Sequence, residues 1–364
     1  MSPRIAIQAD QVVHPHGEVQ SFSRRWQELA REQGVEADLV DVYEPEALEV
    51  VREYDGFMWR CPPDAHTKEF ALRFLTAVES GLGKPVFPDW WTRWHLEDKV
   101  IQAYMLQALG VRTPENWIFW DRDQALDFLK GARFPLVLKL LSGFQSRNVR
   151  LLNNIDEARY FLDSLFGRGL SSLAYGPASP LRELGRKVRQ AAKAIGGRPS
   201  PDPGVENEIH RNYFYVQEFI PDNDFDTRIT VIGERAFGFR RFNRPNDFRA
   251  SGSGRIDITP ENIDPRAVEM AFDISKSLGS QVLGIDVVTR DGEPLVLELT
   301  LGFPNFVLRE CPGYWLRNSG REGGLAWVGG RIRPEDAIFQ DFVGRLEDQG
   351  QRAAGKDGQP AILS

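Results

Sequence analysis

Two acidic residues interrupt the apolar strands of the segment GIDVVTRDGEPLVLELT, which runs from Gly284 to Thr300. Asp286 lies among the aliphatic residues of the first arm, and Glu298 lies among those of the second. The Asp-Gly pair between them predicts a tight β-hairpin, because it supplies the positive φ that the turn requires. An ionised carboxylate is costly to bury unless it is paired, hydrogen-bonded or bound to a metal. The two acids therefore need a chemical reason to lie in this hairpin.

The hairpin allows two interpretations of Asp286 and Glu298. Both acids lie at similar distances from the turn, so the fold should place them at about the same height on adjacent strands. The sequence does not set the register, and a slip of one residue would send them to opposite faces. In one interpretation both acids point to solvent. In the other they are hard oxygen ligands for Mg²⁺, which shares its coordination shell with phosphate and water.

A lysine at the end of a buried strand is a candidate phosphate contact. Lys139 closes the apolar run FPLVLK and precedes a small polar loop that contains Ser142, Gly143 and Ser146. The backbone N–H groups of such a loop can hold an anion while the lysine meets the phosphate. It is not a Walker A loop, because it joins two strands and no helix follows. The alternative is an ordinary hairpin loop beside a lysine whose stem lies on apolar surface.

Another strand carries polar residues that suit a nucleotide base. The sequence YVQEFI ends with Gln217, Glu218, Phe219 and Ile220. Where such a strand ends free, its backbone groups can pair with an adenine edge while apolar neighbours sandwich the ring. Taken alone, the pattern also fits a half-exposed edge strand.

The segment from 226 to 254 is dense in arginine, with Arg228, Arg235, Arg240, Arg241, Arg244 and Arg249. Because side chains alternate along a strand, Arg228 and one of Arg240 and Arg241 are expected to converge on one cleft. Guanidinium groups suit the geometry of carboxylates and phosphates. This segment is therefore a candidate anion site.

The last of these arginines precedes a loop rich in Ser and Gly. Arg249 begins the sequence RASGSG, which includes Ser251 and suits closure over an anion. The other interpretation of each arginine is a solvated strand face. We favour that interpretation for Arg235 and Arg244.

The composition is that of a globular protein whose 364 residues suit two or three packed units. A net charge of −7 argues against a nucleic-acid partner held mainly by electrostatics. Cys61 and Cys311 are the only cysteines, so a disulfide framework is not expected and a reducing compartment fits. The sequence has neither a signal-peptide pattern nor a membrane-spanning apolar run. We expect a cytoplasmic protein with no membrane partner.

The elements that must position these residues follow two patterns. Strands and helices alternate up to an aromatic-rich break at 88–95, which predicts a parallel sheet covered by helices. Beyond the break, a helix over 97–109 leads into a region of strands. A later helix has Asp264 as N-cap, Pro265 in its first turn and Gly279 at its end, and it leads into the hairpin. We expect a mixed α/β fold.

The region 167–211 has a different composition, with Gly, Pro and Ser clusters around one basic helix over 181–194. We interpret it as an insertion or mobile flap, because structureless loops of this length are usually functional or disordered. One hypothesis is that it closes over an anionic substrate and contacts the acceptor. A solvated helix is the alternative. The tail after Gln349 is polar and is expected to fray.

The order of these motifs resembles the ATP-grasp superfamily. The ordered set is EDK at a helix start, VLK, a small polar loop, QEFI, DTRITVIG, RR, NDFRASGSG, GIDVV and LELT. The resemblance covers 91–305, and over 217–303 it is greatest to the ribosomal-protein glutamate ligases and related amino-acid ligases. It implies an N-terminal parallel α/β pre-ATP-grasp domain over 1–90 and a two-lobed ATP-grasp domain over 91–330. A C-terminal helix and polar tail would occupy 331–364.

The resemblance also implies a role for each matching residue. Within the ATP-grasp domain it implies a small lobe over 115–216, with the insertion at 167–211, and a large lobe over 217–330. Lys99 and Lys139 look like the phosphate lysines, and Asp226 looks like a ribose or nucleotide contact. The remaining expected nucleotide contacts are Ser142, Gly143, Ser146, Gln217, Ser251 and the adenine linker Glu218, Phe219 and Ile220. The γ-phosphate and acyl-phosphate would meet Arg228, Arg241 and Arg249, and the Mg²⁺ ligands would be Asp286, Glu298 and Thr300, with Mn²⁺ as an alternative ion.

The sequence departs from the family pattern at three points. Thr300 stands where family members usually have asparagine, and its neutral hydroxyl is a poorer metal ligand than an amide oxygen. Ser251 stands where the glutamate ligases have asparagine, and the phosphate loop has a single glycine. These departures bear on the metal geometry more than on ATP binding.

The chemistry that the resemblance implies is carboxylate activation. ATP would phosphorylate a carboxylate to an acyl-phosphate, and an amine would displace phosphate to form an amide. The partners would be a small-molecule or peptide carboxylate and an amine acceptor, neither of which the sequence identifies, and it leaves the oligomeric state open. A kinase-like phosphotransferase and a non-catalytic nucleotide-binding regulator are the alternatives. The two acids of the hairpin disfavour the regulator.

Overall fold

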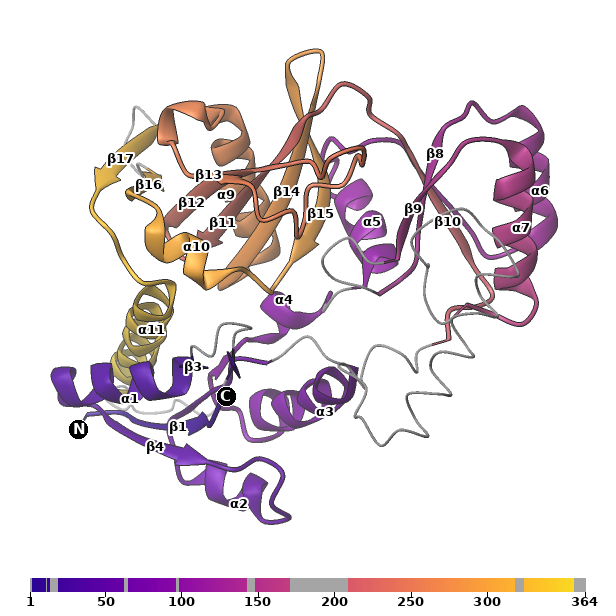
Figure 1. The fold of residues 1–364 in the computed structure, drawn as a ribbon. Helices are drawn as coiled ribbons and strands as arrows, with labels where there is room; N and C mark the ends of the chain where they lie inside the picture. Colours follow the sequence, from indigo (N-terminus) through magenta and orange to yellow (C-terminus); the bar gives the residue numbers. More distant parts are fainter. Residues whose placement is uncertain are drawn as a thin grey trace, which may run out of the picture.

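The computed structural model describes residues 2–10, 12–13, 19–61, 65–95, 98–142, 148–170, 209–317 and 324–356. Gly143, Ser146 and most of the predicted insertion therefore lie outside the described residues. The described chain forms a parallel sheet, a small antiparallel sheet and a large antiparallel sheet, each with helices packed on it (Figure 1). This confirms the expected mixed α/β fold.

The N-terminal unit is a parallel sheet with strand order β4-β1-β5-β6. Its elements are β1 (Arg4–Gln8), β2 (Val12–Val13), β3 (Val19–Gln20), α1 (Phe22–Gln33), β4 (Glu36–Val40), α2 (Ala47–Arg52), β5 (Gly56–Met58), α3 (Ala65–Thr76), the π-helical turn η1 (Ala77–Gly81) and β6 (Val86–Phe87). Alternation along β1 sends Ile5 and Ile7 to the core beneath α1, and it sends Ala6 to the core beneath α2 and α3. Helices thus cover both faces of the sheet, as the alternating pattern predicted.

The small lobe is an antiparallel sheet with order β7-β10-β8-β9. Its elements are β7 (Asn116–Phe119), α6 (Arg122–Gly131), β8 (Leu136–Lys139), β9 (Val149–Leu152), α7 (Ile155–Phe166) and β10 (Phe214–Glu218). Helices α6 and α7 lie together over one face. The sequence analysis missed α7, although Asn154 accepts a hydrogen bond from the backbone N–H of Glu157 as its N-cap.

The large lobe is a seven-stranded sheet in which β15-β14-β11-β12-β16-β17 form the main path and β13 pairs with β12. Its elements are β11 (Phe225–Ile232), β12 (Arg235–Phe242), β13 (Ile256–Asp257), the short 3₁₀ turn η2 (Pro260–Asn262), α9 (Pro265–Leu278), β14 (Val282–Arg290), β15 (Glu293–Thr300), α10 (Asn305–Glu310), β16 (Gly313–Arg317) and β17 (Leu325–Gly329). Helix α9 packs on one face and has the predicted N-cap Asp264 and the left-handed C-cap Gly279.

Two short helices connect the N-terminal unit to the lobes. Helix α4 (Trp90–Arg93) follows β6, and α5 (Lys99–Ala108) lies between the small and large lobes (Figure 1). Asp98 caps α5 by accepting hydrogen bonds from two backbone N–H groups of its first turn. The Gln102 side chain then accepts a hydrogen bond of 3.0 Å from the backbone N–H of Leu299 on β15. Helix α5 thereby holds Lys99 against the hairpin.

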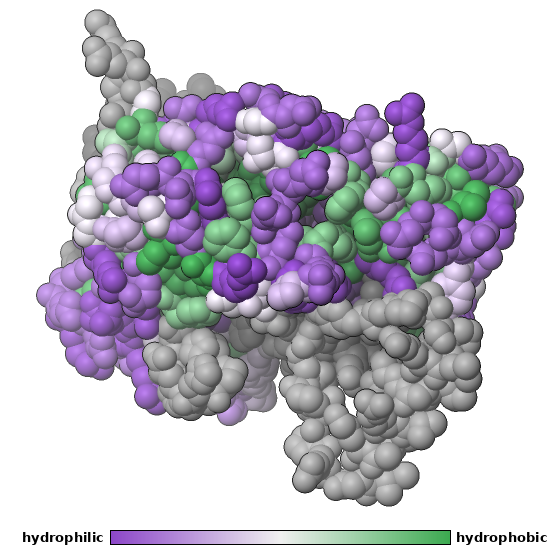
Figure 2. All heavy atoms as spheres, turned by 45° about the horizontal axis from the view of Figure 1, so that its top comes forward, coloured by the Kyte–Doolittle hydropathy of each residue, from purple (hydrophilic) through white to green (hydrophobic). Residues whose placement is uncertain are grey.

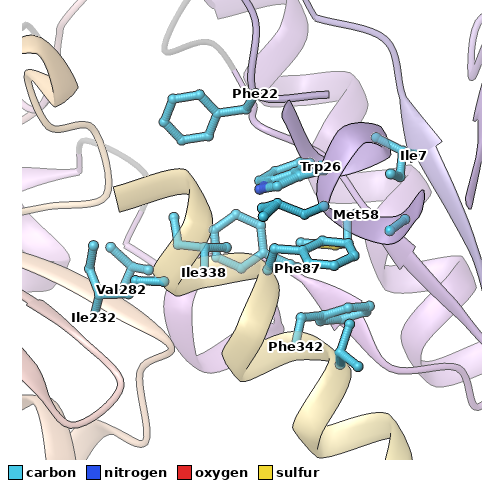
Figure 3. Close-up of a cluster of buried hydrophobic side chains, with 14 of the residues drawn as sticks. Ile7, Phe22, Trp26, Met58, Phe87, Ile232, Val282, Ile338 and Phe342 are labelled. Carbon is cyan, nitrogen blue, oxygen red and sulfur yellow. The ribbon is translucent and has the colours of Figure 1, made fainter. Parts of the chain in front are cut away.

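The last helix, α11 (Pro334–Lys356), completes the N-terminal unit. Ile338 and Phe342 of α11 belong to the same core as Trp26 of α1, and this core also includes Val282 of the large sheet (Figure 3). The indole N–H of Trp26 donates to the backbone carbonyl of Glu335 at 2.9 Å. The N-terminal and C-terminal segments of the described chain therefore share one core.

The face of the molecule in Figure 2 is mainly hydrophilic at its periphery, with apolar patches between the hydrophilic regions. No helix in the described part of the chain combines the length and the apolar character required to span a membrane.

Candidate active site

One cavity of about 830 Å³ brings together nearly all of the predicted site residues that the structure describes. The predicted residues that line it are Lys99, Lys139, Gln217, Glu218, Phe219, Ile220, Asp226, Arg228, Arg241, Arg249, Ser251, Asp286, Glu298 and Thr300. Its walls also include residues from the N-terminal unit, such as Arg60. The cavity is large enough for a cofactor-sized ligand together with a second small molecule.

The hairpin that carries the two acids is β14 and β15, and Asp286 lies directly opposite Glu298. The pairing is shifted by a bulge between Asp286 and Val287, which leaves Leu297 without a direct partner on β14. Without this extra residue Leu297 would oppose Asp286, and Glu298 would face the other side of the sheet. The bulge therefore places both carboxylates on one face, in the cavity.

The acids belong to a charged row that crosses β12, β11, β14 and β15. The guanidinium of Arg228 binds both oxygens of Asp286, at 2.5 and 2.6 Å. Arg241 binds both oxygens of Asp226, at 2.6 and 2.7 Å, and also contacts Asp286 at 2.7 Å. The sequence predicted that Arg228 and either Arg240 or Arg241 would converge on one cleft. Arg228 and Arg241 both line the cavity, so this prediction is confirmed for Arg241.

The two aspartates of this row titrate differently because they share their arginines unequally. Asp286 faces two guanidinium groups, which hold the pKa of its carboxyl below the usual range despite its burial. Burial is the largest influence on Asp226 and raises its pKa to about 6, while Arg241 lowers it and neighbouring Asp286 raises it further. Asp286 is therefore the permanently ionised member of the pair.

Both predicted lysines lie at the β15 side of the cavity. Lys99 is 3% exposed, and its Nζ lies 3.0 Å from a carboxylate oxygen of Glu298. Lys139 is also buried, and its Nζ donates to the backbone carbonyl of Leu297 at 3.1 Å. Burial lowers the pKa of Lys139 to about 8, although Glu298 raises it. Lys139 has no carboxylate partner in hydrogen-bond range among the described residues.

The residues predicted to contact adenine lie at the end of β10 and directly after it. Glu218 pairs with Arg290 and accepts a hydrogen bond of 3.2 Å from the backbone N–H of Glu115, so its side chain is held at the edge of the sheet. Gln217 is buried and donates to the side chain of Asn116 at 2.8 Å. The linker residues line the cavity beside apolar groups, which suits a planar ring.

Arg249 connects the large lobe to the small lobe. Its guanidinium binds Asp247, with a closest distance of 2.5 Å, and donates to the backbone carbonyl of Val149 on β9 at 3.3 Å. Neither Arg235 nor Arg244 lines the cavity, and both are half-buried and bound to other groups of the protein. Arg244 donates to the carbonyl of Ser251 at 2.6 Å, and Arg235 pairs with Asp341 of α11 at 2.8 Å.

Two residues with predicted ligand contacts, Thr300 and Ser142, already interact with other groups of the protein. The hydroxyl of Thr300 donates to the carbonyl of Gly302 at 2.9 Å, which holds the turn after β15. Ser142 is not among the residues that line the cavity, and its hydroxyl lies 3.4 Å from Nε2 of His210. The roles of Thr300 in metal binding and of Ser142 in nucleotide binding remain predictions.

Arg60 and Asn305 are among the cavity residues that the sequence analysis did not single out. Arg60 follows strand β5 at the carboxyl edge of the parallel sheet, where ligands commonly bind, and this position was a usable signal. Asn305 begins α10 a few residues after the hairpin, and no pattern in the sequence distinguishes it.

The hairpin acids fit a divalent cation whose shell is completed by phosphate. Among the residues the structure describes, no group of three or more His, Cys, Asp or Glu side chains could hold a metal alone. Mg²⁺ in phosphoryl-transfer sites is usually bound by one or two carboxylates together with substrate phosphates and water. Asp286 and Glu298 face each other on adjacent strands and match that donor set.

Part of the chain is similar to known proteins. A family model described as a RimK-like ATP-grasp domain matches residues 189–302. The alpha-aminoadipate–LysW ligase LysX of Saccharolobus solfataricus is 24% identical over 66% of this chain and 73% of its own length. A probable alpha-L-glutamate ligase of Pasteurella multocida is 26% identical over 56% of this chain and 52% of its own length.

A solved structure shares the fold. The ATP-grasp ligase PsnB, solved with a phosphomimetic variant of a minimal precursor, Mg and ADP, superposes with a TM-score of 0.54. It is 14% identical and covers 94% of this chain and 98% of its own. The parallel N-terminal sheet and the two antiparallel lobes are thus arranged as in an ATP-grasp protein.

Proposed function

We infer that this chain, which belongs to the ATP-grasp superfamily and carries a RimK-like domain, is an ATP-dependent ligase that joins a carboxylate to an amine. The observation that carries this inference is the convergence of two lysines, three arginines and two acids on one cavity. Such a site supplies charge and position rather than a side-chain nucleophile, as transfer of a phosphoryl group requires.

The reaction proceeds in two substitutions. A carboxylate oxygen of the first substrate attacks the γ-phosphorus of ATP, the bond to the β,γ-bridging oxygen breaks, and ADP leaves. The amine nitrogen then attacks the acyl carbon, phosphate leaves with the electron pair of the C–O bond, and the nitrogen loses a proton. The products are one amide, one ADP and one phosphate.

The residues of the cavity divide this work. The linker at Glu218 to Ile220 would hold the base, and Lys99 and Lys139 would contact the phosphates. Asp286 and Glu298 would hold Mg²⁺, with Mn²⁺ as an alternative, and the ion would neutralise charge on the phosphates. Glu298 is paired with Lys99, and Asp286 is paired with Arg228. If the acids held the ion, these two cations would be available to contact the phosphates.

The arginines would stabilise the charge that moves during transfer. Arg228 and Arg241 are buried beside Asp286, where a fixed guanidinium acts strongly because water is excluded. Arg249 lines the cavity where the large lobe meets the small lobe, and it would contact the transferred phosphoryl group. The names of the relatives specify alpha-aminoadipate, LysW and L-glutamate, and we propose a small-molecule or peptide carboxylate and an amine for this chain.

The test is an ADP-release screen of carboxylic acids against amines, repeated with hydroxylamine. Hydroxylamine intercepts an acyl-phosphate as a hydroxamate, so a ligase releases ADP and forms a hydroxamate from the acid alone. A true ligase then gives one phosphate per amide when the amine is present. ADP formed with a hydroxyl compound, together with a stable phosphoester in the mass spectrum, would replace the ligase with a kinase-like phosphotransferase.

A further inference from the structure

Arg60 of the N-terminal unit presents an uncommitted guanidinium to the cavity. Its side chain is 24% exposed and lies over the ring of Phe22, with 4.2 Å between the guanidinium carbon and the ring centroid. Its buried Nη1 has no hydrogen-bond partner among the described residues. The nearest carboxylate that pairs with it is Asp10, at 3.8 Å, which is beyond hydrogen-bond range.

The carboxylate of Asp10 already accepts hydrogen bonds at the start of α1. It accepts them from the backbone N–H groups of Phe22 and Ser23 at 3.2 and 2.7 Å, and from the hydroxyl of Ser21 at 3.1 Å. These bonds hold the start of α1. Asp10 therefore balances the charge of Arg60 in part and leaves its donors available.

A second donor without a partner lines the same cavity. Asn305 is 1% exposed, and its Nδ2 is buried with no hydrogen-bond partner among the described residues. An unpaired buried amide N–H costs free energy, so natural structures rarely leave one without a ligand or water. Asn305 follows Phe303 by two residues, and the ring of Phe303 lies 6.3 Å from the ring of Phe22, over which Arg60 is placed.

These donors lie beyond the charged row, on the side of the N-terminal unit. Arg228 of the row donates to the carbonyl of Gly302 at 3.4 Å, and Phe303 follows in the chain. The ring of Phe303 lies 6.3 Å from that of Phe22, over which Arg60 is placed. A substrate whose reacting end lies at Arg228 can therefore extend along these rings toward Arg60.

We propose that Arg60 and Asn305 form a subsite for a carboxylate of the substrate that is not activated. A single guanidinium with a neighbouring amide donor matches the two oxygens of a carboxylate. The acidic neighbours Asp10 and Glu335 make the surroundings less suitable for a dianionic phosphate. This inference rests on the proposed ligase function, and it specifies that one of the two substrates carries a spectator carboxylate.

The spectator carboxylate has two sources, and the test separates them. The full chain is assayed for ADP release with a panel of common amino acids and short dicarboxylates. In one arm each dicarboxylate, such as glutarate, is compared with its monoamide as the activated partner. In the other arm each amino acid, such as L-alanine, is compared with its amide as the acceptor. We expect kcat/KM to favour the acid by about tenfold to a hundredfold in one arm, which identifies the source.

Variants then assign the preference to the subsite. Arg60→Gln should abolish the preference for the acid over the amide, with the KM for ATP unchanged, and Arg60→Lys should retain part of it. Asn305→Leu, which removes the donor but keeps an apolar-compatible shape, should weaken it. Arg122→Gln is the matched control, because Arg122 lies on α6 and pairs with Asp163 away from the cavity.

The outcomes distinguish the two proposals. If acid and amide react equally in both arms, or if Arg60→Gln keeps the full preference, the subsite is overturned while the ligase stands. If no pair in the panel releases ADP, or if only hydroxyl compounds do, the proposed ligase function itself fails. Thermal denaturation of each variant shows whether a loss of activity reflects unfolding instead.

Discussion

Asp286 and Glu298 face each other across β14 and β15 only because one extra residue is inserted into β15. The bulge converts a hairpin that would split the two acids into one that presents both to the same cavity. Bulges often occur beside active sites, where they redirect a side chain. The position of two carboxylates thus depends on the backbone at Leu297.

Removing either acid should stop turnover. Asp286→Asn and Glu298→Gln each replace a hard anionic oxygen with a neutral amide, so we expect kcat for ADP release to fall by about a hundredfold or more. Asp273→Asn is the control, because Asp273 is exposed on α9 and pairs with Arg317 outside the cavity. Near-normal ADP release from both acid variants would refute the assignment.

Asp286→Asn should also lower the free energy of unfolding. It leaves Arg228 and Arg241 without the carboxylate that they share in a buried site, a change that costs about 3 kcal/mol. Urea denaturation measures the difference, and an unchanged midpoint would mean that the row is not energetically coupled.

The pH dependence should reveal Lys139. Because burial lowers the pKa of Lys139 to about 8, its positive charge is lost as the pH rises through that value. We expect kcat/KM for ATP to fall above about pH 8, since this quantity reports the ionisation of the free enzyme. Lys139→Arg keeps the charge and should remove the decline, whereas Lys130→Arg, at an exposed site on α6, should not. A decline that persists in Lys139→Arg would assign it to another group.

Asp226 offers a test between two roles. The sequence suggested a ribose contact, whereas the structure places both of its oxygens on Arg241. If Asp226 positions Arg241, Asp226→Asn should lower kcat by about tenfold. The variant should keep the wild-type ratio of activity with ATP to activity with 2′-deoxy-ATP. The wild-type rate should also fall below about pH 6, where Asp226 becomes protonated, and this decline should be absent in the variant. A selective loss of the preference for ATP over 2′-deoxy-ATP would support the ribose contact instead.

The core beneath α1 should depend on α11. Phe339 is fully buried on α11, and Phe339→Ala should lower the free energy of unfolding by about 3–5 kcal/mol. Leu72→Ala, at an exposed position of α3, should change it by less than about 0.5 kcal/mol. Denaturant titration of both variants compares them, and equal midpoints would contradict the shared core.

Local patterns predicted most of the elements because the physics that forms them is local. The caps of α9 lie within a few residues of its ends, and Asp264 and Gly279 occupy the predicted positions. Helix α7 was missed although its N-cap, Asn154, is of the usual type. The attachment of α11 to the N-terminal sheet was not predictable, because it depends on contacts such as that between Trp26 and Glu335, more than 300 residues apart.

The site was predictable in its residue types but not in its pairing. The two acids, Lys139 and the arginines each had a local signal, whereas Lys99 was expected only from the order of motifs. The register that aligns Asp286 with Glu298 depends on a bulge for which the sequence carries no clear mark. Arg60 contacts this cavity only through the packing of a distant sheet, so no spacing in the sequence connected it to the hairpin.

The sharing of one core by α1 and α11 has a consequence for the order in which the protein forms. During synthesis the parallel sheet and α1 are made before the two lobes, and the helix that packs on Phe22 and Trp26 is made after them. Until Pro334 to Lys356 has been translated, Phe22 and Trp26 lack the helix that packs on them, although both lobes of the cavity are already complete in sequence. The N-terminal unit therefore completes its native core only after both lobes have been made, and in that interval its uncovered aromatic side chains expose the nascent chain to aggregation.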